Sequence, residues 1–119
     1  MREVPIVHHD DHLVVIDKPA GILVVQAPGR RGPTIVDLVS AQLSQRVQAV
    51  HRLDEGTTGV LALALDDAGR TGMEELFRAH AVLRDYLALL ATTPSPPAGR
   101  IDSGLREGDD GIMRVVATR

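Results

Sequence analysis

A cluster of ionisable side chains lies in the middle of the chain, within the segment VQAVHRLDEGTTGVLALAL at residues 47–65. Two apolar runs that are typical of strands flank its four members, which are His51, Arg52, Asp54 and Glu55. Asp, Glu, Gly and Thr are also ordinary turn formers, so one interpretation is a solvated turn without chemistry. The other is a catalytic turn, because a carboxylate at a strand end, with an arginine two positions earlier, can be aimed at a substrate by the sheet.

Other groups of reactive residues give weaker patterns. His8, Asp10 and His12 in the HHDDH run are of metal-binding types, but adjacent strand residues point to opposite faces, which favours a hairpin turn over a metal site. EGTTG has neither the length nor the lysine of a phosphate-binding loop, and HRLD differs from the kinase order HRD. A nucleophile-elbow context is missing around the serines, which are Ser40, Ser44, Ser95 and Ser103.

The composition predicts a small protein without disulfides. With 119 residues the chain is one domain or part of a larger one, and its only aromatic residues are Phe77 and Tyr86, so aliphatic side chains must build the core. The absence of cysteine excludes disulfides and thiolate zinc sites, and the N-terminus resembles neither a signal peptide nor a membrane span. We therefore expect a cytoplasmic protein. The net charge of −3 argues against a non-specific polyanion binder, while every basic residue except Lys18 is an arginine, which suits phosphate contacts.

The first half of the chain predicts strands and one helix. Residues 5–9 and 12–17 predict a hairpin that ends at a KPAG turn. Residues 21–26 predict a further strand, followed by a loop rich in Gly, Pro and Arg. Apolar residues at helical spacing predict a helix over 34–44, with Thr34 as its N-cap.

The second half predicts another helix and more strands. Asp66 or Asp67 can cap a helix over residues 68–81. Residues 60–65 are apolar at every position and predict a strand that needs cover on both faces. Three further strands are predicted at residues 82–91, 100–105 and 111–118.

Four motifs in a fixed order resemble the RluA family of pseudouridine synthases over essentially the whole chain. They are DDHLVVIDKPAGILV, VHRLDEGTTGVLALA, LFRAHAVLRDYLALL and GRID. The resemblance implies an α+β fold with a mixed, largely antiparallel sheet and flanking helices. It also implies isomerisation of uridine to pseudouridine in structured RNA, either rRNA or tRNA, without a metal ion or an organic cofactor.

The resemblance assigns roles to three residues. Asp54 corresponds to the catalytic carboxylate, which fits the positive charge that develops on a sugar when its glycosidic bond breaks; whether it acts as nucleophile or base stays open. Arg52 corresponds to the residue that enters the RNA stack in place of the flipped uridine. Tyr86 corresponds to the tyrosine that stacks on uracil and assists proton removal from carbon five.

Further positions receive supporting roles. We expect His51 to orient the turn, and Thr57, Thr58 and Gly59 to shape it through local hydrogen bonds. The residues predicted to contact RNA are Arg52, His51, Arg84, Arg30 and Arg31. Thr58 stands where the family usually has serine, and Arg84 where it usually has lysine; both keep the polar character.

Family members continue beyond the residues that correspond to Arg119, and that continuation supplies a second pocket wall and a cationic partner for the catalytic Asp. We therefore expect residues 1–119 to be the N-terminal part of a catalytic domain without an S4-type RNA-binding domain, monomeric, and inactive and marginally folded alone. Two alternatives remain: a non-catalytic RNA-binding module or degenerate paralogue, and a metal-dependent hydrolase that uses His8, Asp10 and His12.

Overall fold

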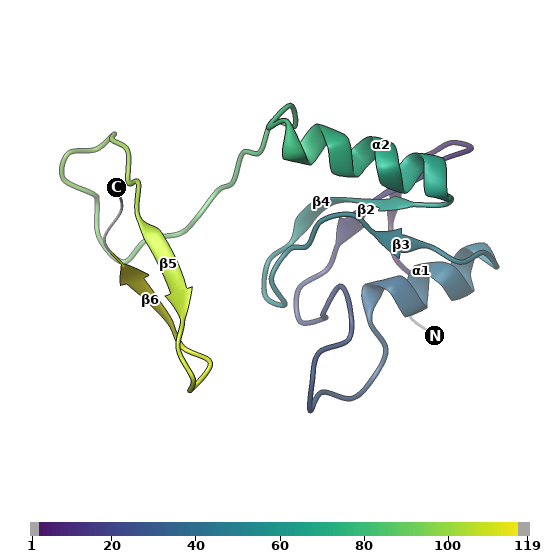
Figure 1. The fold of residues 1–119 in the computed structure, drawn as a ribbon, viewed down its shortest axis with the longest axis horizontal. Helices are drawn as coiled ribbons and strands as arrows, with labels where there is room; N and C mark the ends of the chain where they lie inside the picture. The colour runs from purple at the N-terminus through teal and green to yellow at the C-terminus, as the bar shows by residue number, and fades with distance from the viewer. Residues whose placement is uncertain (1–2, 117–119) are drawn as a thin grey trace. The chain divides into compact units, whose positions relative to one another are not determined.

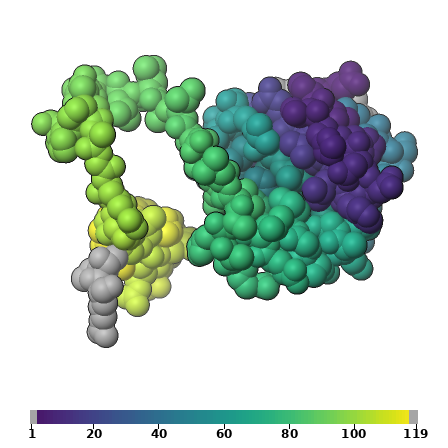
Figure 2. Space-filling model, turned by 90° about the horizontal axis from the view of Figure 1, so that it is seen from above, coloured from purple at the N-terminus to yellow at the C-terminus, as the bar shows by residue number. Residues whose placement is uncertain are grey.

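The first compact unit is a four-stranded sheet with one helix on each face (Figure 1). The computed structural model describes residues 3–116, which divide into one unit that ends at Arg84 and a second that begins at Asp85. Side chains of the first unit, coloured purple to teal, pack closely against one another in the space-filling view (Figure 2). The candidate catalytic turn belongs to this unit.

The strands of the sheet are antiparallel to their neighbours and follow the order β1-β2-β4-β3. Their bounds are β1 Ile6–His9, β2 Leu13–Lys18, β3 Gln48–Ala49 and β4 Gly59–Ala64. The predicted first hairpin and the α+β class with a largely antiparallel sheet are confirmed. Lys18 pairs with Gly59, so the end of β2 lies beside the point where the candidate turn enters β4.

One face of the two central strands builds the core. Val14 and Ile16 of β2 and Leu61 and Leu63 of β4 are fully buried. Helix α1, Ile35–Leu43, covers this face with side chains that include its buried Ile35. These aliphatic contacts form the core without any aromatic residue, as the composition predicts.

The helix α1 begins at the predicted cap. Thr34 accepts a hydrogen bond from the backbone N–H of Asp37, whose carboxylate accepts one from the Thr34 N–H. The strand predicted at residues 21–26 is wrong, because the carbonyls of Leu23 and Val24 accept hydrogen bonds from the first amides of the helix instead of from a neighbouring strand. This segment therefore crosses the core as irregular chain and leads into the helix.

Helix α2, Asp67–Arg78, lies on the opposite face of the sheet (Figure 1) and is capped by Asp66. It ends at Arg78, whereas the predicted helix continues to residue 81. A side chain at Gly69 would collide with the carbonyl oxygen of His12, so this glycine lets the helix approach the β1–β2 turn closely. The described residues cover this second face only in part, as the 67% exposure of Val60 shows.

The second unit is a hairpin with little buried surface. Its strands are β5 Gly104–Glu107 and β6 Met113–Val116. The strand predicted at 82–91 is wrong, because no described strand pairs with it to accept its backbone hydrogen bonds. The strand predicted at 100–105 begins later, and residues 117–118 of the last prediction lie outside the described residues.

Apolar side chains of the second unit are largely open to solvent. Leu87 and Leu89 are fully exposed, and Val115 of β6 is 71% exposed. A two-stranded hairpin without a buried face is marginally stable at best.

Within the described residues, no helix is long and apolar enough to cross a membrane.

Candidate active site

A buried lysine holds the turn that connects β3 to β4. The Lys18 ammonium donates hydrogen bonds to three backbone carbonyls, those of Pro19 at 2.9 Å, Glu55 at 3.0 Å and Thr57 at 2.9 Å. Its side chain is fully buried. All three ammonium protons therefore have acceptors, and two of the acceptors belong to the candidate catalytic turn.

Burial and nearby carboxylates act on the charge of Lys18 in opposite directions. Burial lowers the pKa of Lys18, while the negative charges of Glu55 and Asp54 oppose that shift. Sequence reasoning missed the importance of this lysine. The signal was present, because Val14, Ile16 and Lys18 alternate along β2, which places the ammonium on the buried face.

Backbone contacts complete the shape of the turn. The Gly21 N–H donates to the carbonyl of Glu55, and the Thr57 N–H donates to the carbonyl of Asp54. Gly59 has a φ of +127°, a conformation that glycine adopts without strain. Thr57 and Gly59 thus contribute to the turn through their backbones, and the predicted shaping roles of Thr57, Thr58 and Gly59 stay predictions.

The His51 ring links the turn to the strand that follows it. Its Nε2 accepts a hydrogen bond of 3.0 Å from the Ala62 N–H, and the ring stacks on Phe77 of α2 with centroids 4.7 Å apart. Since Nε2 acts as acceptor, the proton of the neutral ring is on Nδ1, which is shielded from solvent without a hydrogen-bond partner among the described residues. Burial, and then the charge of Arg84, lower the pKa of His51. A neutral, fixed ring fits an orienting role.

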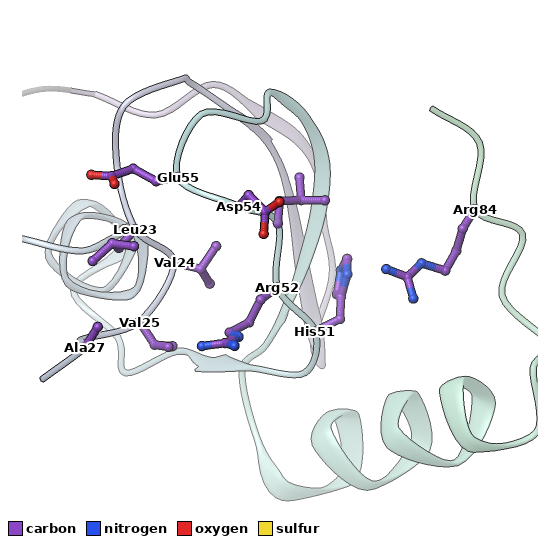
Figure 3. Close-up of a pocket in the computed structure, with 10 residues that line it drawn as sticks. Leu23, Val24, Val25, Ala27, His51, Arg52, Asp54, Glu55 and Arg84 are labelled. Atoms are coloured by element: carbon purple, nitrogen blue, oxygen red, sulfur yellow. The ribbon is translucent and has the colours of Figure 1, made fainter. Parts of the chain in front are cut away.

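A pocket of about 400 Å³ opens at this turn (Figure 3). One wall is apolar and comes from the segment before α1: Leu23, Val24, Val25 and Ala27. The other side carries residues of the turn and of the end of the first unit, all polar except Leu53: His51, Arg52, Leu53, Asp54, Glu55 and Arg84. The Arg84 guanidinium points toward His51 (Figure 3) and lies 5.9 Å from the centroid of the Phe77 ring.

Four predicted site residues meet in this pocket: His51, Arg52, Asp54 and Arg84. Asp54 is exposed, and among residues 3–116 no lysine or arginine forms an ion pair with it. A pocket that holds a solvent-exposed carboxylate and two guanidinium groups suits a polyanionic substrate on which positive charge develops in the transition state.

Two predicted RNA contacts of the first unit, Arg30 and Arg31, do not line the pocket. Arg30 pairs with Glu55 at 2.6 Å, and Arg31 is exposed on the same loop. Tyr86 belongs to the second unit and is 58% exposed there. Their assignments stay predictions.

The HHDDH run forms two separate pairs. His8 Nε2 lies 2.8 Å from Asp10, while His12 Nδ1 lies 2.7 Å from Asp66, the N-cap of α2. In the described part of the chain, no three His, Cys, Asp or Glu residues come together in a group that could hold a metal ion. The alternative of a metal-dependent hydrolase therefore has no ligand set in these residues.

The comparison with protein families identifies the family to which these residues belong. Residues 12–118 match the profile of the family described as RNA pseudouridylate synthase. The chain belongs to this family. The pseudouridine synthase match contains the whole pocket, from Leu23 to Arg84.

Individual relatives agree with this assignment. The relative named RNA pseudouridine synthase 2, chloroplastic, from Arabidopsis thaliana is 30% identical over 94% of the chain. The mitochondrial pseudouridylate synthase RPUSD4 from Homo sapiens is 36% identical over 82% of the chain. The solved structure of Human RNA Pseudouridylate Synthase Domain Containing 4 matches with a TM-score of 0.72 and 34% identity, covering 94% of this chain. The chain spans 47% of that solved chain and about a third of the length of the plant relative.

Proposed function

We propose that residues 1–119 form the Asp54-bearing part of an enzyme that isomerises uridine to pseudouridine in structured RNA. The observation that carries this proposal is the position of Asp54, open to solvent in a pocket that also holds Arg52 and Arg84, inside a segment that matches the pseudouridylate synthase family. The turn that carries Asp54 is fixed by Lys18, which keeps the carboxylate at a defined place.

Asp54 is the proposed catalytic carboxylate. In the isomerisation, the bond from ribose C1′ to N1 of uracil breaks and a bond from C1′ to C5 forms. The proton on C5 is then lost and N1 gains one, so that atoms balance. A carboxylate can stabilise or capture the sugar while the base is detached, because positive charge develops on the ribose.

The arginines are the proposed RNA contacts. Arg52 takes the place of the extruded uridine in the stack, for which a flat and permanently charged guanidinium is suited. Extrusion of a base costs a few kcal/mol, which stacking and phosphate contacts offset. Arg84, on the other side of His51, can bind phosphate at the same pocket.

Tyr86 is proposed to stack on the uracil and to assist removal of the C5 proton. The support is its place in the RDY motif two residues after Arg84, a residue that lines the pocket. We further propose that rRNA or tRNA is the substrate and that a monomer acts in the cytoplasm, without metal or organic cofactor. Size-exclusion chromatography tests the monomeric state, and cell fractionation tests the cytoplasmic location.

Release of tritium from RNA that carries [5-³H]uridine tests the proposed function, because only loss of the C5 hydrogen frees the label. Any sequence that follows Arg119 in the gene is included in the protein that is assayed. We expect release from a folded stem-loop rRNA or tRNA fragment and none when Asp54 is replaced by asparagine. Absence of release from total rRNA and tRNA, with RNA binding intact, would instead favour a non-catalytic RNA-binding module.

A further inference from the structure

A tight turn places Arg30 at the rim of the pocket. The Arg30 N–H donates to the carbonyl of Ala27 at 3.1 Å, with Pro28 and Gly29 between them and a φ of +73° at the glycine. Proline followed by a residue with positive φ is the pattern of a type II turn, whose conformation the two residues fix in advance. One end of this turn, Ala27, lines the pocket.

The other end of the turn is attached to the catalytic turn. Both terminal nitrogens of Arg30 contact the Glu55 carboxylate, at 2.6 and 3.2 Å. The carbonyl of Glu55 also accepts hydrogen bonds from Lys18 Nζ and from the N–H of Gly21. Glu55 therefore joins three segments: the KPAG turn, the 27–30 turn and the turn that carries Asp54.

The side chain of Glu55 points away from Asp54 (Figure 3), so its carboxylate serves the rim and leaves the centre of the pocket open. We propose that Glu55 is a positioning residue, which holds the 27–30 turn at the pocket rim through Arg30. Arg30 is then occupied by a protein carboxylate, and its neighbour Arg31 is the arginine of this loop that meets an RNA phosphate. The RNA contact of Arg31 rests on the proposed function, whereas the positioning role of Glu55 does not.

The geometry distinguishes this pair from an ordinary surface ion pair. Exposed pairs of long, flexible side chains contribute little to stability. Here the arginine is bidentate and its backbone is already fixed by the 27–30 turn, so less conformational entropy is lost on pairing. Among the described residues Arg31 forms no ion pair, although it lies in the same loop.

Hydrogen exchange of the Arg30 amide in the full chain tests the positioning role without any RNA. We expect Glu55→Gln and Arg30→Gln each to speed this exchange by roughly two- to fivefold, and the double variant to add nothing further. Arg31→Gln is the matched control, since it removes the same charge from the same loop, and should leave the exchange rate unchanged.

Swapping the acidic and basic side chains between positions 30 and 55 tests for a rescue that a merely structural glutamate would not show. Arg30→Glu sets two carboxylates against each other and should speed exchange further. Combining it with Glu55→Arg should return the rate to within about twofold of the original, because the pair is re-formed in the opposite sense. Fast exchange in this combined variant, or unchanged exchange in Glu55→Gln, would overturn the positioning role.

RNA binding separates the two arginines. With a uridine-containing stem-loop at two salt concentrations, Arg31→Gln should weaken binding and flatten its salt dependence, whereas Arg30→Gln should change the salt dependence little. Equal loss in both variants would overturn the assignment of Arg31 as the phosphate contact of the loop. If the original protein binds no RNA, the proposed function and the Arg31 assignment fail, whereas the exchange result for Glu55 stands by itself.

Discussion

The Nζ atom of Lys18 lies 2.9 Å from the carbonyl oxygen of Thr57, a residue 39 positions later in the chain. The same nitrogen binds the carbonyl of Glu55, so one buried ammonium fixes the main chain immediately after Asp54. The position of the proposed catalytic carboxylate therefore depends on a residue that does not line the pocket.

Replacing Lys18 should destabilise the first unit and disturb the turn. We expect Lys18→Met to lower the free energy of unfolding by about 2–4 kcal/mol, because three partly buried carbonyls lose a charged donor. Urea unfolding followed by NMR signals of β2 and β4 measures the change. Lys18→Arg is the control that keeps the charge; its planar guanidinium cannot meet all three carbonyls, so its stability should fall between the two. A Lys18→Met protein as stable as the original would contradict this role.

The sequence allowed prediction where local patterns determine structure. Alternation and turn residues predicted the first hairpin, and helical spacing after Thr34 predicted α1 with its cap. The motif order placed His51, Arg52 and Asp54 on one turn, where the structure has them in one pocket with Arg84.

The remaining features depend on partners that are distant in sequence. Residues 21–26 are as apolar as a strand, but their carbonyls bind the amides that begin α1. The pairing of Arg30 with Glu55 joins positions 25 apart, and nothing in either local sequence distinguishes it from an RNA contact. Residues 82–91 have the composition of a strand but no pairing strand among the described residues.

His12 and His51 each contact a residue that is distant in the sequence, and their pKa values should lie on opposite sides of 6.5, the ordinary value for histidine. Burial lowers the pKa of His51, whereas the hydrogen bond to Asp66 raises that of His12. His51 thus favours the fold less as pH falls below 6.5, because its folded form resists protonation. The contribution of His12 is complete below 6.5 and is lost as pH rises through its raised pKa. Ring NMR signals followed against pH give both values.

Asp66→Asn provides the control for this titration. It removes the charge that holds the His12 proton and should lower the pKa of His12, while that of His51 stays unchanged because His51 contacts Ala62 and Phe77 instead. Titration of His51 above 6.5 would contradict a neutral ring that accepts a hydrogen bond from the Ala62 amide.

The hairpin of the second unit should exchange its amide hydrogens much faster than the central sheet. Amides of β2 and β4 lie in a four-stranded sheet with a buried face, whereas β5 and β6 pair only with each other and are mostly exposed. We expect protection at least about 100-fold greater in β2 and β4. Comparable protection in both sets of strands would show that the hairpin is stabilised by contacts beyond those described.

Arg52→Ala should reduce activity more on folded RNA than on flexible RNA. If Arg52 replaces the flipped uridine in the stack, its loss matters most where the base must be extruded from a helix. We expect a loss of about tenfold or more on a stem-loop and a smaller loss on an unstructured strand of the same sequence. Arg46→Ala, which removes an exposed arginine outside the pocket, is the matched control. Equal losses of activity on the two RNAs would exclude the intercalating role.

Tritium release by Asp54→Asn, compared with the original protein on the same [5-³H]uridine-labelled stem-loop, tests the central claim most directly. An amide can act neither as a nucleophile nor as a base, so we predict that release falls to background, while the Kd for the RNA stays within about threefold because Asp54 forms no ion pair with the described residues. Release by Asp54→Asn at a rate near that of the original protein would contradict the assignment of Asp54 as the catalytic carboxylate.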